Sequence, residues 1–236
     1  MYVVNDEIND EEIDQIKVLI KMSELCDNYK HVERVGFLCE FLSYKLSDVS
    51  EYSNYITEKY IKNIFLSSQL HDIGKVGIPD RILLKPSKLT PEEFDIMKKH
   101  SAIGTNILRK VQKKYTSNKF LDMGINIAEY HHEKWNGSGY PKGISGEDIP
   151  LSARIVSLID VYDALRTKRV YKDAYSHNES VKIIKQGEGA HFDPLICKVL
   201  LENQEELRNI YENLMSYEVS TEEYKRENVI KLITIK

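Results

Sequence analysis

Apolar residues recur at steps of three and four along most of this chain, which is the spacing of amphipathic α-helices. The clearest stripe comprises Val32, Val35, Cys39, Leu42 and Leu46, after a shorter one at Ile13, Ile16 and Ile20. Similar patterns predict helices at about 55–72, 101–115, 120–132, 151–166, 178–187 and 193–213. The tail at 225–236 alternates enough to be a short strand or a frayed helix. We therefore predict an all-α fold in a single helical domain.

Local signals indicate one helix start and one long loop. Thr90 is a good N-cap, since Pro91 follows at the first helical position and Glu92 and Glu93 fall in the first turn. The segment 134–150 holds four glycines and two prolines and is expected to be a loop. Loops of this length in a compact domain are often functional.

Composition narrows the class of protein. The chain has 236 residues and a formal net charge of -4, which gives no basic footprint for duplex nucleic acid but leaves a small anionic ligand open. Cys26, Cys39 and Cys197 form no paired framework and are read as thiols in a reducing compartment. The acidic N-terminus does not resemble a signal peptide and no apolar run is long enough to span a bilayer, so a cytoplasmic location is expected.

Histidines and aspartates at helix ends are the candidate metal ligands. His71 and Asp72 end an apolar helix just before Gly74, which would let the backbone turn away. His131 and His132 end the helix that precedes the long loop. Each pair has a simpler interpretation: a polar helix end for the first, and one surface histidine in the second.

Three further residues have the same ambiguity, taken singly. His31 shares the apolar stripe with Val35, as a hydrogen-bonded core histidine also would, and His100 would also suit a solvated helix face. Asp160 lies within the apolar run RIVSLIDVYDAL, where an unpaired carboxylate is costly. Side chains of this kind on several helices can converge in a bundle core and bind two metal ions. Mixed His and Asp donors favour Fe, Mn, Zn, Ni or Co over Mg or Ca.

The order of these motifs resembles the HD-GYP branch of the HD-domain metal-dependent phosphohydrolases. The resemblance covers about residues 25–200 and rests on HDIGKVGIPD (71–80), HHEKWNGSGYPKGISGEDIPLSARIVSLIDVYDAL (131–165) and GEGAHFDP (187–194). It includes the tripeptide Gly139–Tyr140–Pro141 that names the group. The resemblance implies a helical fold, two or three divalent metal ions (Fe or Mn favoured), and hydrolysis of cyclic di-GMP to a linear dinucleotide or GMP.

The resemblance also implies roles for particular residues. One ion would be bound by His31, His71, Asp72 and Asp160, and the second by Asp72, His100, His131 and His132, with Asp72 bridging. Lys75 would meet the scissile phosphate, Arg169 and Lys172 would hold the ligand's phosphates, and Tyr140 would contact a base. By the same resemblance 1–24 is a helix packed on the domain, 25–210 the catalytic domain and 211–236 an extension.

Departures from the family pattern leave some of this open. Asn136 stands where the family usually has Asp, and we interpret it as an adjustment around the ligands. Asp27 lies four residues before His31, where trinuclear members have a Glu; it is either a third-metal ligand or a helix N-cap. The alternatives to cyclic di-GMP hydrolysis are another cyclic dinucleotide as substrate and a catalytically silent module that binds such a ligand. A regulatory protein partner or a homodimer is expected.

Overall fold

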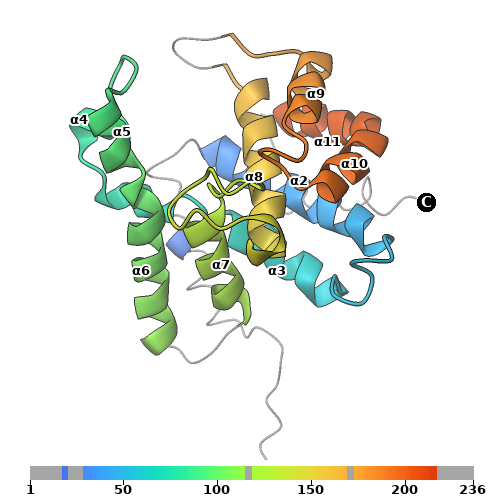
Figure 1. Ribbon diagram of the computed structural model, residues 1–236, viewed down its shortest axis with the longest axis horizontal. Helices are drawn as coiled ribbons and strands as arrows, with labels where there is room; N and C mark the ends of the chain where they lie inside the picture. The colour runs from blue at the N-terminus through green and yellow to red at the C-terminus, as the bar shows by residue number, and fades with distance from the viewer. Residues whose placement is uncertain (1–17, 21–28, 115–118, 169–172, 217–236) are drawn as a thin grey trace, which may run out of the picture.

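The structure is a computed structural model that describes residues 18–20, 29–114, 119–168 and 173–216 (Figure 1). These residues form helices joined by loops, and within them the only β-type pairing is a single bridge between Glu188 and Phe192. The prediction of an all-α fold is confirmed. The tail at 225–236, where a strand or frayed helix was expected, lies outside the described residues.

The described helices follow one another with short connections. In chain order they are α2 (Tyr29–Ser47), α3 (Glu58–Ser68), the 3₁₀ helix η1 (Ile73–Gly77), α4 (Asp80–Leu83), α5 (Pro91–Met97), α6 (Lys99–Lys114), α7 (Lys119–Tyr130), the 3₁₀ helix η2 (Gly146–Asp148), α8 (Leu151–Arg166), α9 (His177–Gln186), α10 (Pro194–Glu202) and α11 (Gln204–Ser216).

Two hydrophobic clusters hold these helices together. The larger joins α2, α3 and α8 to the C-terminal helices α9, α10 and α11, and its fully buried side chains include Phe41, Leu42 and Tyr162. The smaller cluster is centred on Leu70, Leu108 and Phe120 and joins the end of α3 to α6 and α7. Figure 1 shows α6 and α7 on one side of the molecule and α9, α10 and α11 on the other, with α8 between them. The polar site described below lies where the two groups of helices meet.

Helix ends explain where the sequence predictions succeed and fail. Thr90 caps α5 as predicted, since its side chain accepts from the Glu93 N–H and the Glu93 side chain accepts from the Thr90 N–H. The predicted helix at 193–213 is wrong as a single element, because the chain breaks at Asn203 and forms α10 and α11. The helix predicted at 55–72 spans only Glu58–Ser68.

The predicted domain limits near residues 24 and 210 can be compared with the described helices. Of the first 24 residues only 18–20 are described; they are helical, and Leu19 packs into the smaller cluster. Helix α11 continues across the proposed limit at residue 210, with Ile210 and Tyr211 both buried in the larger cluster. Among the described helices, none combines the length and the apolar character that a membrane span requires.

Candidate metal centre

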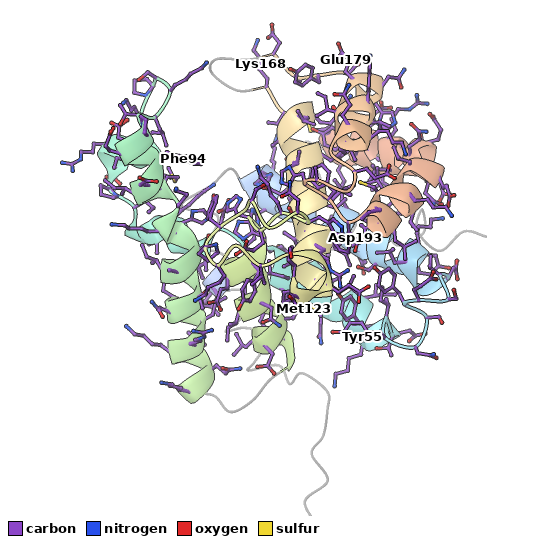
Figure 2. The ribbon with its side chains drawn as sticks, in the orientation of Figure 1. Tyr55, Phe94, Met123, Lys168, Glu179 and Asp193 are labelled. Carbon is purple, nitrogen blue, oxygen red and sulfur yellow. The ribbon has the colours of Figure 1, made fainter. Side chains whose placement is uncertain are left out.

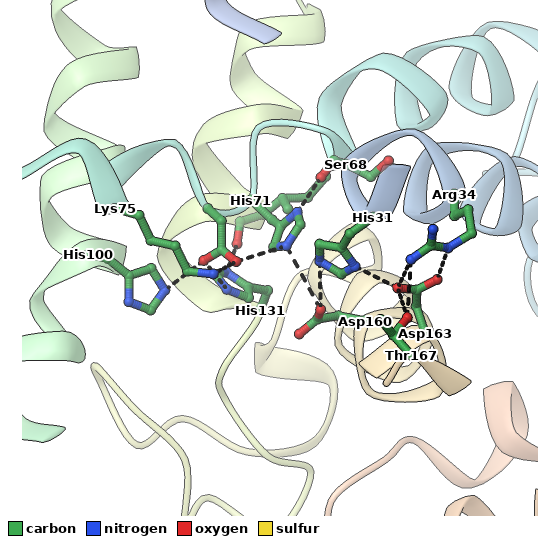
Figure 3. A network of polar contacts seen from close by, with 12 residues as sticks. His31, Arg34, Ser68, His71, Lys75, His100, His131, Asp160, Asp163 and Thr167 are labelled. Carbon is green, nitrogen blue, oxygen red and sulfur yellow. Dashed lines mark hydrogen bonds and ion pairs between the residues drawn. The ribbon is translucent and has the colours of Figure 1, made fainter. Parts of the chain in front are cut away.

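Five separate elements deliver the predicted ligands to one place. His31 comes from α2, His100 from α6 and Asp160 from α8. The two pairs lie just past helix ends: His71 and Asp72 in the turn between α3 and η1, His131 and His132 directly after α7. Figure 3 shows their polar contacts as one continuous row from His100 to Asp160 and His31. Five of the seven residues, His31, Asp72, His100, His132 and Asp160, line a pocket of about 540 Å³.

The donor atoms form two groups that share one carboxylate. In the first group, donors of His31, His71 and Asp72 lie within 4.8 Å of one another; in the second, so do those of Asp72, His100, His131 and His132. Around Asp72, its Oδ2 lies 3.1 Å from His71 Nε2 and its Oδ1 lies 3.2 Å from His100 Nε2. Asp160 Oδ1 lies 3.3 Å from His31 Nε2 and 3.9 Å from His71 Nε2. A carboxylate between two imidazole groups is the arrangement that can bridge two ions.

Three of the histidines are oriented by their own helices. The Nδ1 atoms of His71, His100 and His131 lie 2.8, 2.7 and 2.9 Å from the backbone oxygens of Ser68, Met97 and Ile127. A carbonyl oxygen only accepts, so each Nδ1 carries a hydrogen and Nε2 is the nitrogen left to face the site. An imidazole held in this way binds a metal through Nε2.

Several inward atoms lack the partner that a buried polar atom needs. His71 Nε2, His131 Nε2 and Asp72 Oδ1 are buried and have no hydrogen-bond partner among the described residues. Such atoms are costly to bury unsatisfied. All three atoms face the site and are of types that bind a metal, so one or two bound cations would satisfy them together. The donor set of imidazole nitrogens and carboxylate oxygens fits a divalent transition metal.

The electrostatics of the second group favour neutral imidazoles. Burial lowers the pKa of His132 to about 4, and burial likewise lowers the pKa values of His131 and His100. Burial would raise the pKa of Asp72, but the ammonium of Lys75 and the adjacent His71 outweigh it and hold that pKa well below its usual range. Near neutral pH this group therefore presents lone pairs and one negative charge, which is what a cation requires.

His31 has the opposite charge state in the metal-free protein. Burial would lower its pKa, but hydrogen bonds to Asp160 and Asp163 outweigh that effect and raise the pKa to about 10. A cation bound at His31 Nε2 would therefore have to displace a proton from it.

Glycine at position 74 allows the metal-ligand turn to lie against α6. A Cβ atom built on Gly74 would lie 1.9 Å from the backbone oxygen of His100 and 2.4 Å from the nitrogen of Gly104. Gly74 does not have a positive φ, so a left-handed backbone conformation is not the reason for glycine here. It is needed because η1 and α6 touch backbone to backbone, which brings Asp72 to His100.

Lys75 and the glycine-rich loop border the pocket. Lys75 Nζ lies 2.6 Å from Asp72 Oδ2 and lines the pocket. From the loop, the Tyr140 ring stacks on His132 with centroids 4.7 Å apart and faces Phe94 of α5 at 6.3 Å. Figure 2 labels Phe94, which lies on α5 and is 47% exposed, and Lys168, which follows the end of α8. Both residues line the pocket.

Two buried carboxylates organise this site and were not predicted. Glu133 accepts the backbone N–H groups of Lys142 and Gly143, and so fixes the loop that carries Tyr140. Asp163 accepts from His31 Nδ1. The argument made for Asp160, a carboxylate in an apolar helix, applies equally to Asp163 three residues later and would have found it.

Five other residues singled out in the sequence can now be placed, or lie outside the described part of the chain. The solvated-face alternative for His100 is wrong, since the residue is 2% exposed. Asn136 accepts from the N–H and the hydroxyl of Ser138, so its side chain serves its own loop rather than the ligands. Asp27, Arg169 and Lys172 lie outside the described residues.

Comparison with known proteins places the fold and the site in a family. Residues 39–196 match the HD domain family. The chain is 46% identical over 175 residues to a cyclic di-GMP phosphodiesterase of Vibrio cholerae, covering 74% of this chain and 36% of that protein. It is 40% identical over 176 residues to the 3'3'-cGAMP-specific phosphodiesterase 2 of Vibrio cholerae, covering 75% and 31%. The chain belongs to the HD-domain family, in the HD-GYP branch that its motifs indicate.

A solved structure agrees with the fold. Bd1817, an HDG"Y"P protein from Bdellovibrio bacteriovorus, superposes with a TM-score of 0.55 at 21% identity over 86% of this chain and 66% of that one. The chain spans between about a third and a half of the length of the curated relatives it matches.

Proposed function

We propose that this domain is a metal-dependent phosphodiesterase that opens a cyclic dinucleotide, with cyclic di-GMP as the first candidate substrate. The observation that carries the proposal is the pair of donor groups sharing Asp72 at the base of an open pocket. The relatives named as cyclic dinucleotide phosphodiesterases support the substrate class.

In this proposal the seven ligands divide as the two donor groups do. His31, His71, Asp72 and Asp160 would hold one divalent ion, and Asp72, His100, His131 and His132 would hold the other. Bound ions of this kind act as Lewis acids and lower the pKa of water to near 7, which makes a nucleophile available at neutral pH. Fe and Mn suit the mixed nitrogen and oxygen donors. A third ion at Asp27 is a further part of the proposal.

Lys75 is the protein's own cation at the reacting phosphate. Its Nζ forms an ion pair with Asp72 Oδ2, and as an ammonium group it has no lone pair with which to bind a metal. A fixed ammonium here stabilises the negative charge that builds on the phosphate oxygens during in-line attack. Breaking the bond to the 3′ oxygen then leaves a linear dinucleotide.

The pocket mouth suits a nucleotide. Tyr140 and Phe94 present two aromatic rings on which a base can stack, and Lys98 lies over both, at 5.4 Å from Phe94 and 5.9 Å from Tyr140. Lys168 also lines the pocket and directly precedes Arg169. We propose that Arg169 and Lys172 grip the phosphate that is not cleaved.

A second candidate substrate is a mixed adenine and guanine cyclic dinucleotide, favoured by the 40% identity to a relative named for 3'3'-cGAMP. The contacts that recognise phosphate are the same for both compounds, so the choice depends on the base edges alone. A cytoplasmic location and a regulatory partner or homodimer remain predictions.

The test is turnover by the purified protein reloaded anaerobically with Fe(II) or Mn(II). Cyclic di-GMP and 3'3'-cGAMP are supplied separately, and products are separated by chromatography. A linear dinucleotide or mononucleotide that Asp72→Ala does not produce supports the proposal, and the faster substrate identifies the preference. Full metal occupancy with neither compound hydrolysed would refute hydrolysis and favour a ligand-binding module.

A further inference from the structure

One ligand histidine is oriented differently from the others. His71, His100 and His131 each donate Nδ1–H to a backbone oxygen three or four residues earlier. His31 Nδ1 instead lies 2.7 Å from Oδ2 of Asp163, which belongs to α8 and is 132 positions away in sequence. Helix α2 therefore does not fix its own ligand.

Asp163 is itself held from several sides. Its Oδ1 accepts from Arg34 Nε at 2.6 Å, and its Oδ2 accepts from the Arg34 guanidinium at 2.9 Å and from the Thr167 hydroxyl at 3.3 Å. The side chain is fully buried. Both carboxylate oxygens of Asp163 already accept hydrogen bonds from side chains. Asp163 therefore lies behind His31 rather than in the row of ligands, as Figure 3 shows.

We infer that Asp163 is a positioning residue that sets the tautomer and direction of His31, and that Arg34 restrains Asp163 in turn. This inference rests on the proposed metal centre and adds residues to it.

The physical reason is the one-way character of the hydrogen bonds. Guanidinium groups only donate, so the Asp163 oxygens accept from Arg34 and the carboxylate has no hydrogen of its own to give. His31 Nδ1 must then carry a hydrogen, which makes Nε2 the nitrogen that faces the site and that binds a cation once its own proton is displaced. There, Nε2 lies 3.3 Å from Asp160 Oδ1. Without Asp163 the ring can rotate or take the other tautomer, and partners of this kind are worth about 10–100-fold in metal affinity.

The two donor groups allow a selective test. His31 contributes to the first group only, while His100, His131 and His132 complete the second. Mn(II) is titrated into the chelator-treated full chain by calorimetry. We expect Asp163→Asn to weaken one class of Mn(II) site about 10–100-fold and to leave the other within about twofold of its original affinity. An amide keeps the shape of the side chain but places an N–H group against Arg34 or His31.

Asp193→Asn is the matched control. Like Asp163, Asp193 is buried and paired with an arginine. Its partner is Arg154 of α8, whose Nη1 lies 2.5 Å from Asp193 Oδ2. Its other hydrogen-bond donors include the backbone N–H groups of Leu195 and Ile196 and the Tyr52 hydroxyl. It touches none of the proposed ligands, so it should lower the melting temperature and leave both classes of site unchanged.

The outcomes separate the possibilities. Unchanged affinity at both sites in Asp163→Asn overturns the inference, as does equal weakening of both sites. If Asp163→Asn does not fold, Arg34→Lys decides, because it keeps the charge but loses the paired contacts: selective weakening of one site supports the inference, and no change overturns it. If the unaltered chain binds two Mn(II) ions yet hydrolyses no cyclic dinucleotide, the proposed function fails while this inference stands.

Discussion

Replacing Gly74 by alanine adds one methyl group at the closest backbone contact of the site. The new Cβ would start 1.9 Å from the His100 backbone oxygen and 2.4 Å from the Gly104 nitrogen. Both neighbours are main-chain atoms of α6, so no side chain can rotate to make room. Moving the 1.9 Å contact out to an ordinary 3.4 Å requires η1 and α6 to separate by about 1.5 Å.

This displacement has a cost in stability and in metal binding. Overpacking of this kind costs about 1–3 kcal/mol, and we expect the upper end because backbone must move. At about 2–4 °C per kcal/mol for a chain of this size, the melting temperature should fall by about 6–12 °C. The separation would also lengthen the 3.2 Å approach of Asp72 to His100, so Mn(II) affinity should fall.

Circular dichroism melts and Mn(II) calorimetry on Gly74→Ala check both effects. Gly124→Ala is the control, because its Cβ would meet only Leu70 and Leu108 side chains at 3.4 and 3.7 Å. Gly124 lies within α7, where alanine favours the helix by about 1 kcal/mol, so the control should melt at the same temperature or higher. A Gly74→Ala protein that melts and binds Mn(II) like the unaltered chain would refute the steric argument.

Three other predictions follow from the site. Lys75→Ala should bind metal normally but lose about 100-fold or more in kcat, measured by single-turnover hydrolysis, and a normal rate would remove Lys75 from the reaction. With chelator present, the free energy of unfolding should fall as the pH drops from about 6.5 to 4. The reason is that His132 takes up a proton in the unfolded chain but not in the folded protein, where its pKa is about 4. Urea titrations across this pH range measure the effect, and a stability that stayed flat or rose would contradict it. Glu133→Ala should remove the acceptor of the Lys142 and Gly143 N–H groups and speed tryptic cleavage after Lys142, with unchanged cleavage counting against that anchor.

Much of the site could be predicted because it is encoded in ordered local motifs. The adjacent pairs at 71–72 and 131–132, and the isolated aspartate at 160, stand out in sequence because polar residues end or interrupt apolar helices. Their convergence follows from the family resemblance, and the structure brings all seven side chains together beside one pocket, which five of them line. The roles assigned to them are still predictions.

What the sequence did not reveal depends on contacts between distant segments. Nothing near Arg34 indicates that it faces Asp163, and nothing near Glu133 indicates that it accepts N–H groups nine and ten residues later. The break at Asn203 was missed because apolar periodicity continues on both sides of it. Gly74 was noticed for its flexibility, but its small size matters more, and only the packing of α6 shows that.

The orientation of the histidines has a consequence for biosynthesis. Three rings find their hydrogen-bond acceptors within three or four residues, so each is oriented as soon as its own helical turn has left the ribosome. His31 is made first among them, yet its acceptor follows 132 residues later. At ordinary elongation rates of 5–20 residues per second that delay is roughly 7–26 s. During that interval the nascent chain has the His31 imidazole without its partner carboxylate, and the half of the centre containing His31 can mature only when translation of α8 is complete.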